Sequence, residues 1–131
     1  MTPEAKVKKK VKDVLNDIGA YYTMPVTGGY GNSGAPDFII CIAGLFYGIE
    51  CKANGGKPTA LQLKNHDDIR KAGGIALVID ETNVDNLRKE LISHVEKRTN
   101  SQVVGAGQNA KGSSKGHKVK HQVRVLRTVD E

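Results

Sequence analysis

The chain has 131 residues, of which 38% are hydrophobic and 26% charged, and its formal net charge is +6. This length fits one domain with a modest core. No apolar run approaches the roughly 20 residues of a membrane-spanning helix. The basic N-terminus, "MTPEAKVKKK", has no apolar stretch after it, which excludes a signal peptide of the usual form. The sequence therefore predicts a globular protein with no membrane association.

The positive charge is confined to one end of the chain. Residues 1–96 contain twelve basic and twelve acidic residues, whereas residues 97–131 contain eight basic and two acidic residues. The last segment is also rich in Gly, Ser, Asn and Gln. We expect a domain over 1–96 and a flexible basic arm over 97–131, suited to phosphate contacts. The alternative is a solubilising tail without a specific partner.

An amphipathic helix is predicted over 3–18, because Val7, Val11 and Leu15 recur at helical spacing. Thr2 is the candidate N-cap, and Pro3 suits the first helical position. Glu4 borders the apolar stripe. It is either a favourable first-turn charge at the helix dipole or part of a site. The lysines that follow are expected mostly to face away from the core: Lys8, Lys9, Lys10 and Lys12.

Residues 20–26 are typical of a short strand, and a loop with several glycines follows over 27–34. The loop lacks the Gly-x-x-x-x-Gly-Lys-Ser/Thr order of a nucleotide-binding loop. A mobile connection to the next strand is the simpler interpretation.

A β-hairpin is predicted from two apolar runs, 38–42 and 45–51, joined by Ala43-Gly44. With a two-residue loop, Asp37 lies opposite Glu50, and Lys52 shares their face of the sheet. Facing carboxylates repel each other unless a cation lies between them, and Mg²⁺ prefers oxygen ligands. The alternative is a turn aspartate and a surface Glu-x-Lys pattern, and a bulge would break the register.

The same register directs the side chains of the two cysteines, Cys41 and Cys51, to opposite faces of the sheet. We therefore expect no disulfide between them, which fits a reducing cytoplasm. The sequence has no Cys-x-x-Cys pair, so nothing in it indicates a structural zinc site.

The second half of the predicted domain alternates helix and strand. A helix is expected over 59–72, with Thr59 as N-cap. A buried central strand follows over 75–80, parallel to the strand before the helix. Thr82 and Asp85 resemble a capping pair for a last helix that carries Val84, Leu87, Leu91 and Val95. In the arm, residues 121–127 have the alternation of a short strand. The order indicates a small α/β layer with a mixed sheet.

These residues resemble a known superfamily, the PD-(D/E)XK nucleases, through Pro36-Asp37 and Glu50-Cys51-Lys52. Within it the chain is most similar to a stand-alone VRR-NUC domain, the virus-type replication-repair nuclease. The similar segments are "GAPDF" at 34–38, "GIECKANGGKPTALQ" at 48–62 and "AGGIALVI" at 72–79. The resemblance covers about residues 3–92. It implies a small restriction-endonuclease-like αβββαβ core with a mixed sheet flanked by helices.

The resemblance also assigns roles. Asp37 and Glu50 would ligate Mg²⁺ or Mn²⁺, with the backbone carbonyl of Cys51 as a third protein ligand. Lys52 would position the attacking water or help to deprotonate it, Gln62 would support the site, and Glu4 would lie near the metal. An aliphatic residue is more usual at position 51, but a buried cysteine behaves as a small hydrophobe.

A metal-dependent DNA endonuclease is thus the leading hypothesis. Stand-alone family members are small, viral and often dimeric, which implies a homodimer in the cytoplasm of a bacterial host and a branched DNA substrate. A metal supports phosphodiester hydrolysis by neutralising charge and activating water. The expected DNA contacts are Lys57, Lys111, Lys115, Lys118, Lys120, Arg124 and Arg127. The alternative is a non-catalytic nucleic-acid-binding module on the same fold.

Overall fold

The computed structural model describes residues 1–26 and 34–108. Its helices are α1 (Pro3–Asp17), α2 (Ala60–Lys71) and α3 (Leu87–Gln108), and a 3₁₀ turn, η1 (Val84–Asn86), precedes α3. Its strands are β1 (Tyr21–Thr23), β2 (Phe38–Ile42), β3 (Leu45–Cys51) and β4 (Ile75–Ile79). The predicted order of elements is confirmed, with β1 shorter than the expected strand.

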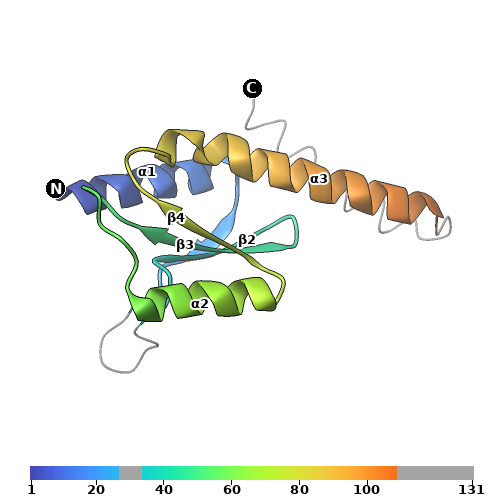
Figure 1. The fold of residues 1–131 in the computed structure, drawn as a ribbon. Coiled ribbons are helices and arrows are strands. Elements are labelled where there is room, and N and C mark those ends of the chain that lie inside the picture. Colours follow the sequence, from blue (N-terminus) through green and yellow to red (C-terminus); the bar gives the residue numbers. More distant parts are fainter. Residues whose placement is uncertain (27–33, 109–131) are drawn as a thin grey trace.

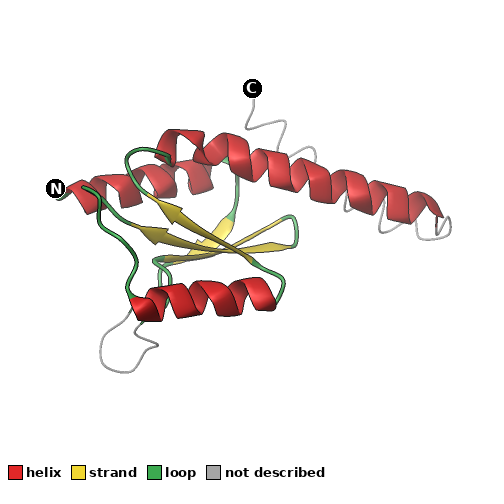
Figure 2. Cartoon of the chain, in the orientation of Figure 1, coloured by secondary structure: helices red, strands yellow, loops and turns green. Residues whose placement is uncertain are grey.

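The strands form one mixed sheet in the order β1-β2-β3-β4, and helices cover both of its faces. The helices α1 and α3 lie together on one face, and α2 packs on β3 and β4 from the other (Figure 1). The colouring by secondary structure makes the three layers visible (Figure 2). The predicted α/β class, with a mixed sheet flanked by helices, is confirmed.

The hairpin has the predicted two-residue loop. Ile42 pairs with Leu45 and Phe38 with Ile49, so the register is the expected one. The loop residues Ala43 and Gly44 have φ angles of 53° and 77°. Positive φ at both central positions is the requirement of a type I′ turn, whose twist matches that of the flanking strands.

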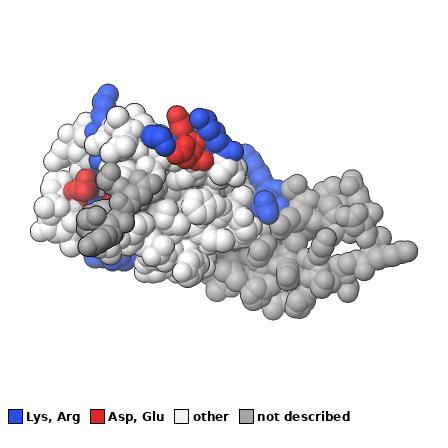
Figure 3. Space-filling model, turned by 90° about the horizontal axis from the view of Figure 1, so that it is seen from below, with Lys and Arg blue, Asp and Glu red and all other residues white. Residues whose placement is uncertain are grey.

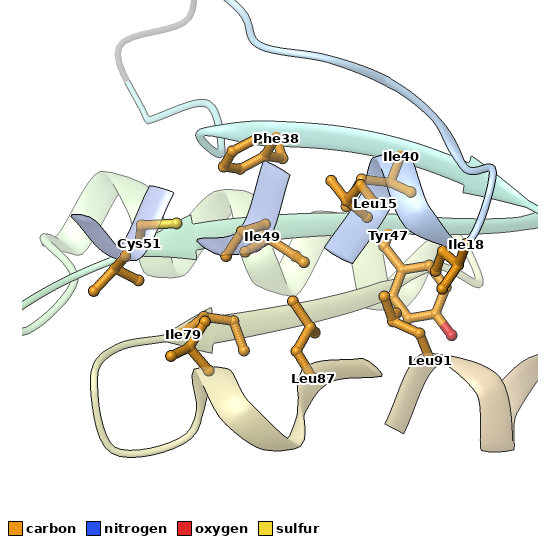
Figure 4. Packing of buried hydrophobic residues seen from close by; sticks show 13 residues of the cluster. Leu15, Ile18, Phe38, Ile40, Tyr47, Ile49, Cys51, Ile79, Leu87 and Leu91 are labelled. Atoms are coloured by element: carbon orange, nitrogen blue, oxygen red, sulfur yellow. The ribbon is translucent and has the colours of Figure 1, made fainter. Parts of the chain in front are cut away.

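The core lies between the sheet and the pair formed by α1 and α3 (Figure 4). The α1 stripe of Val7, Val11 and Leu15 is buried as predicted. Side chains of β2 and β3 complete this core from the sheet. Cys51 is among them, while Cys41 is exposed, so the two thiols lie on opposite faces as expected. Burial raises the pKa of Cys51 to about 12, as suits an apolar core residue.

The opposite face is shaped by a glycine. A Cβ atom on Gly48 would come within 2.6 Å of Ile69 Cδ1 and 2.9 Å of Pro36 Cγ. The missing side chain therefore lets α2 approach the central strand β3, which brings the first turn of α2 close to the end of that strand.

Two local predictions were wrong. β4 is parallel to β3 as expected, but it is an edge strand and not a central one. The Thr82–Asp85 capping pair does not form, because the Thr82 hydroxyl donates to Asp80 Oδ1 at 2.5 Å. The chain then makes the η1 turn before α3 begins at Leu87.

The predicted boundary after residue 96 falls inside α3, which continues to Gln108. The buried stripe of this helix extends from Leu87, Leu91 and Val95 to Thr99, which is 1% exposed. Residues 97–108 are therefore helical, in place of the start of a flexible arm. The expected strand at 121–127, the rest of the arm and the glycine-rich segment 27–33 lie outside the described residues.

Candidate metal centre

Asp37 lies directly before β2, at the end of the sheet away from the hairpin loop. Its Oδ2 accepts a hydrogen bond of 2.8 Å from the backbone N–H of Cys51 on β3. This bond fixes the carboxylate beside the end of β3, and the other carboxylate oxygen, Oδ1, takes no part in it. Within a strand, the N–H and C=O of one residue point to the same edge. The Cys51 carbonyl is thus expected on the Asp37 side, and the next N–H, of Lys52, donates to Ile79 on β4 at 2.9 Å.

Glu50 is the buried carboxylate of the site, only 3% exposed. Its Oε2 accepts from Gln62 Nε2 at 2.9 Å and lies 3.5 Å from Lys52 Nζ. Its Oε1 is buried and finds no hydrogen-bond partner in the described part of the chain. Burial, followed by the negative charge of Asp37, raises the pKa of Glu50 to about 7, although Lys52 acts in the opposite direction.

Gln62 is held by the start of α2. Thr59 and Gln62 form a capping box: the Thr59 hydroxyl accepts from the Gln62 N–H at 3.2 Å. In return, Gln62 Oε1 accepts from the Thr59 N–H at 2.9 Å. The Gln62 amide oxygen therefore caps the helix while its Nε2 holds Glu50. The helix N-terminus also carries partial positive charge next to this carboxylate.

A lysine of α1 completes the cluster, and the sequence prediction was wrong about it. Lys8 was expected to face away, but its Nζ lies 3.4 Å from Glu4 Oε2 and 3.6 Å from Asp37 Oδ1. Burial alone would lower the pKa of Lys8, but the neighbouring charges of Asp37 and Glu4 raise it above its ordinary value. The i, i+4 spacing of Glu4 and Lys8 was the signal that could have indicated this pair.

The structure thus brings together the predicted residues Glu4, Asp37, Glu50, Lys52 and Gln62. Lys57 is exposed on the loop before α2. The other expected DNA contacts lie outside the described residues: Lys111, Lys115, Lys118, Lys120, Arg124 and Arg127.

Helix α2 also carries a buried histidine, His66. It lies one turn after Gln62 on α2 and is 1% exposed. Its Nε2 finds no partner among the described residues, and burial together with Arg70 lowers its pKa. A neutral, buried imidazole fits the packing role that a lone helical histidine usually has.

The donor set fits a hard divalent cation. Two carboxylates of adjacent strands and one backbone carbonyl are oxygen ligands of the kind that Mg²⁺ and Mn²⁺ prefer. The buried Glu50 Oε1 has no hydrogen-bond partner in the described residues, as expected of an atom whose natural partner is a bound cation. No group of three or more His, Cys, Asp or Glu side chains that could hold a metal occurs in residues 1–26 and 34–108. A metal here would therefore depend on the carbonyl and on water for its remaining ligands.

This architecture is shared by a solved structure. It is described as a "VRR_NUC domain" and superimposes on this chain with a TM-score of 0.57 and 28% sequence identity. The match covers 68% of this chain and 97% of that structure. The chain has the VRR_NUC fold. The expected resemblance to VRR-NUC domains and the expected fold class are thereby confirmed, and the fold is that of a nuclease-type domain.

Sequence comparison adds no further relatives, since no protein-family model and no curated protein matches this chain. The VRR_NUC likeness therefore comes from the sequence motifs described above and from the solved structure. Among the described residues, no helix has the length and apolar character needed to cross a membrane.

Proposed function

We propose that this protein is a metal-dependent endonuclease that hydrolyses phosphodiester bonds of DNA. The observation that carries the proposal is the buried Glu50 carboxylate, which faces Asp37 and is fixed on one oxygen by Gln62 and Lys52. The two carboxylates repel each other although Lys8 and Lys52 lie beside them, and the pKa of Glu50 is raised. Perturbed carboxylates of this kind are common at catalytic sites, which agrees with the VRR_NUC fold.

Each side chain has a defined task in this proposal. Asp37 and Glu50, with the Cys51 carbonyl, would hold one Mg²⁺ or Mn²⁺. Such an ion supplies charge neutralisation for the phosphate and lowers the pKa of bound water. Lys52 carries its ammonium beside Glu50 and is 14% exposed at its side chain, so it can reach a water or a phosphate oxygen without leaving the cluster. Gln62 keeps Glu50 in place, and Glu4 pairs with Lys8 beside Asp37.

The proposed substrate is branched or otherwise structured DNA, and the proposed active form is a homodimer. Two copies would present two such sites to two strands, which one 131-residue chain cannot do. Charge on the α2 face is mixed, with basic and acidic side chains next to one another (Figure 3). Affinity for DNA is therefore expected to come mainly from the basic arm.

The test is a cleavage assay on labelled linear, flap and four-way DNA with Mn²⁺, Mg²⁺ or excess EDTA. We expect cleavage only with a divalent cation, most readily of the four-way substrate, and none by Asp37→Asn. Tight binding of DNA by the wild type without cleavage in either metal would favour the non-catalytic binding module. Light scattering tests the dimer.

A further inference from the structure

A second lysine lies at the candidate metal centre, beside the Asp37 oxygen that does not bond to β3. The Oδ2 atom of Asp37 is occupied by the Cys51 N–H, so Oδ1 is the oxygen that remains for a cation. Lys8 Nζ lies 3.6 Å from that same Oδ1. The ammonium of Lys8 thus already acts as the counter-ion of the atom expected to bind the metal.

The surroundings keep this ammonium charged and in place. Glu4, one helical turn earlier on α1, holds Lys8 Nζ from the other side at 3.4 Å. The side chain of Lys8 is only 31% exposed, whereas that of the neighbouring Lys9 is 62% exposed and pairs with Asp13. Lys8 is therefore built into the site, and Lys9 belongs to the solvated face of the same helix.

A divalent cation bound to Asp37 Oδ1 would meet a positive charge at close range. Like charges at such a separation repel strongly when they are partly shielded from water. The metal can bind only if it overcomes this repulsion or if Lys8 moves toward Glu4 and solvent. A DNA phosphate beside the site would offer the displaced ammonium a new partner.

We propose that Lys8 is a displaceable internal counter-ion, which competes with the metal at Asp37 and is released toward a phosphate of the bound nucleic acid. This inference rests on the proposed function, because it takes Asp37 and Glu50 as the metal ligands. Lys8 then weakens metal binding in the free protein and couples metal binding to phosphate binding. By linkage, each ligand strengthens the other through this residue.

The test measures Mn²⁺ affinity by titration calorimetry without DNA, for the wild type, Lys8→Met, Lys8→Arg and Lys9→Met. Lys8→Met should bind Mn²⁺ about fivefold tighter or more, at the lower range of coupling between sites. Lys8→Arg, which keeps the charge, should stay near the wild type. Lys9→Met makes the same change in net charge on the same helix and should also leave the affinity unchanged.

A second readout is DNA affinity with and without Ca²⁺, on full-length protein. The wild type should gain more affinity from the ion than Lys8→Met does. Unchanged or weaker Mn²⁺ binding by Lys8→Met, or an equal tightening by Lys9→Met, would overturn the proposal.

The outcomes separate this inference from the proposed function. If Lys8→Met binds Mn²⁺ more tightly but the wild type cuts no DNA, the counter-ion role of Lys8 is supported and the nuclease function is rejected. If the wild type cuts DNA with a metal but Lys8→Met has unchanged Mn²⁺ affinity, the nuclease function is supported and the counter-ion role is rejected. A wild type that binds no Mn²⁺ would reject both.

Discussion

The Glu50 carboxylate lies at an electrostatically unfavourable position. It is buried, it faces Asp37, and one of its oxygens has no partner in the described chain. Its pKa is raised from an ordinary 4.5 to about 7, so the folded protein takes up a proton that the unfolded chain has already lost. Ionisation of Glu50 therefore has no effect on the free energy of unfolding below pH 4.5. It lowers that free energy progressively between pH 4.5 and 7, and the loss remains above pH 7.

The first prediction follows from this titration. In excess EDTA at pH 8, Glu50→Gln should raise the Tm by several degrees, because it removes the buried charge. At pH 5 the gain should be much smaller, since wild-type Glu50 is then mostly protonated. Thermal melts followed by circular dichroism measure both values, with the exposed Glu96→Gln as control. An equal shift at the two pH values would contradict the raised pKa.

Lys52 is the lysine whose ammonium lies beside Glu50. Lys52→Ala should lower the cleavage rate about 100-fold or more, as expected for the loss of a group that acts on a proton or a phosphate. The protein should stay folded, with a lower Tm because the buried Glu50 loses the ammonium beside it. Gln62→Ala should have a smaller effect and Glu4→Ala an intermediate one, and Lys64→Ala, on the exposed face of α2, none. Wild-type turnover by Lys52→Ala would reduce the lysine to a surface charge.

At the scale of elements, the hairpin fixes the site because its loop sets the register of Asp37 against Glu50. The loop is not optimal, since Ala43 holds a φ of 53°, where L-residues other than Gly, Asn and Asp are strained. The turn is also at the opposite end of the sheet from the candidate metal centre.

Ala43→Asn should therefore stabilise the protein without altering the site. We expect a gain of about 0.5 kcal/mol or more, equivalent to a few degrees of Tm. Ala43→Val, whose branched side chain tolerates positive φ poorly, should destabilise by a similar or larger amount. Cleavage by Ala43→Asn should match that of the wild type. A lower Tm for the asparagine variant would show that a contact of Ala43 itself matters more than its backbone strain.

Most helices, strands and turns could be predicted from the sequence, because the residue patterns that determine them are local. The Ala43-Gly44 turn, the Thr59 cap and the Val7–Val11–Leu15 stripe depend on neighbours within one or two turns of chain. The predicted orientation of Lys8 and the predicted central position of β4 were wrong, because both depend on segments that are distant in the sequence. Whether Lys8 meets solvent or Asp37 depends on the angle at which α1 crosses the sheet. The apolar run of β4 cannot reveal on which side a further strand is missing.

At the scale of the whole molecule, the charge and the site occupy different parts of the chain. Residues 1–96 are neutral overall, and six basic residues lie after Gln108, beyond the end of α3. Because α3 continues to Gln108, we propose that the domain ends after residue 108 and not after residue 96.

A 1–108 truncation should fold like the full chain and bind DNA more weakly, with a smaller dependence of affinity on salt, since fewer counterions are released. Its cleavage rate at saturating DNA should persist. A 1–96 truncation should be less stable, because it removes Thr99 from the buried stripe of α3. Circular dichroism, light scattering and a salt titration compare the two. Unchanged affinity and salt slope for 1–108 would assign the arm to solubility alone.

Anomalous diffraction from a crystal of the wild-type protein loaded with Mn²⁺ would locate the metal ion itself. We expect one ion at about 2.0–2.2 Å from Asp37 Oδ1, Glu50 Oε1 and the Cys51 carbonyl oxygen, the range for a hard cation with oxygen ligands. Lys8 Nζ should have moved away from Asp37. A loaded crystal with no ion between the two carboxylates, or with ions bound only elsewhere, would contradict the proposed metal site.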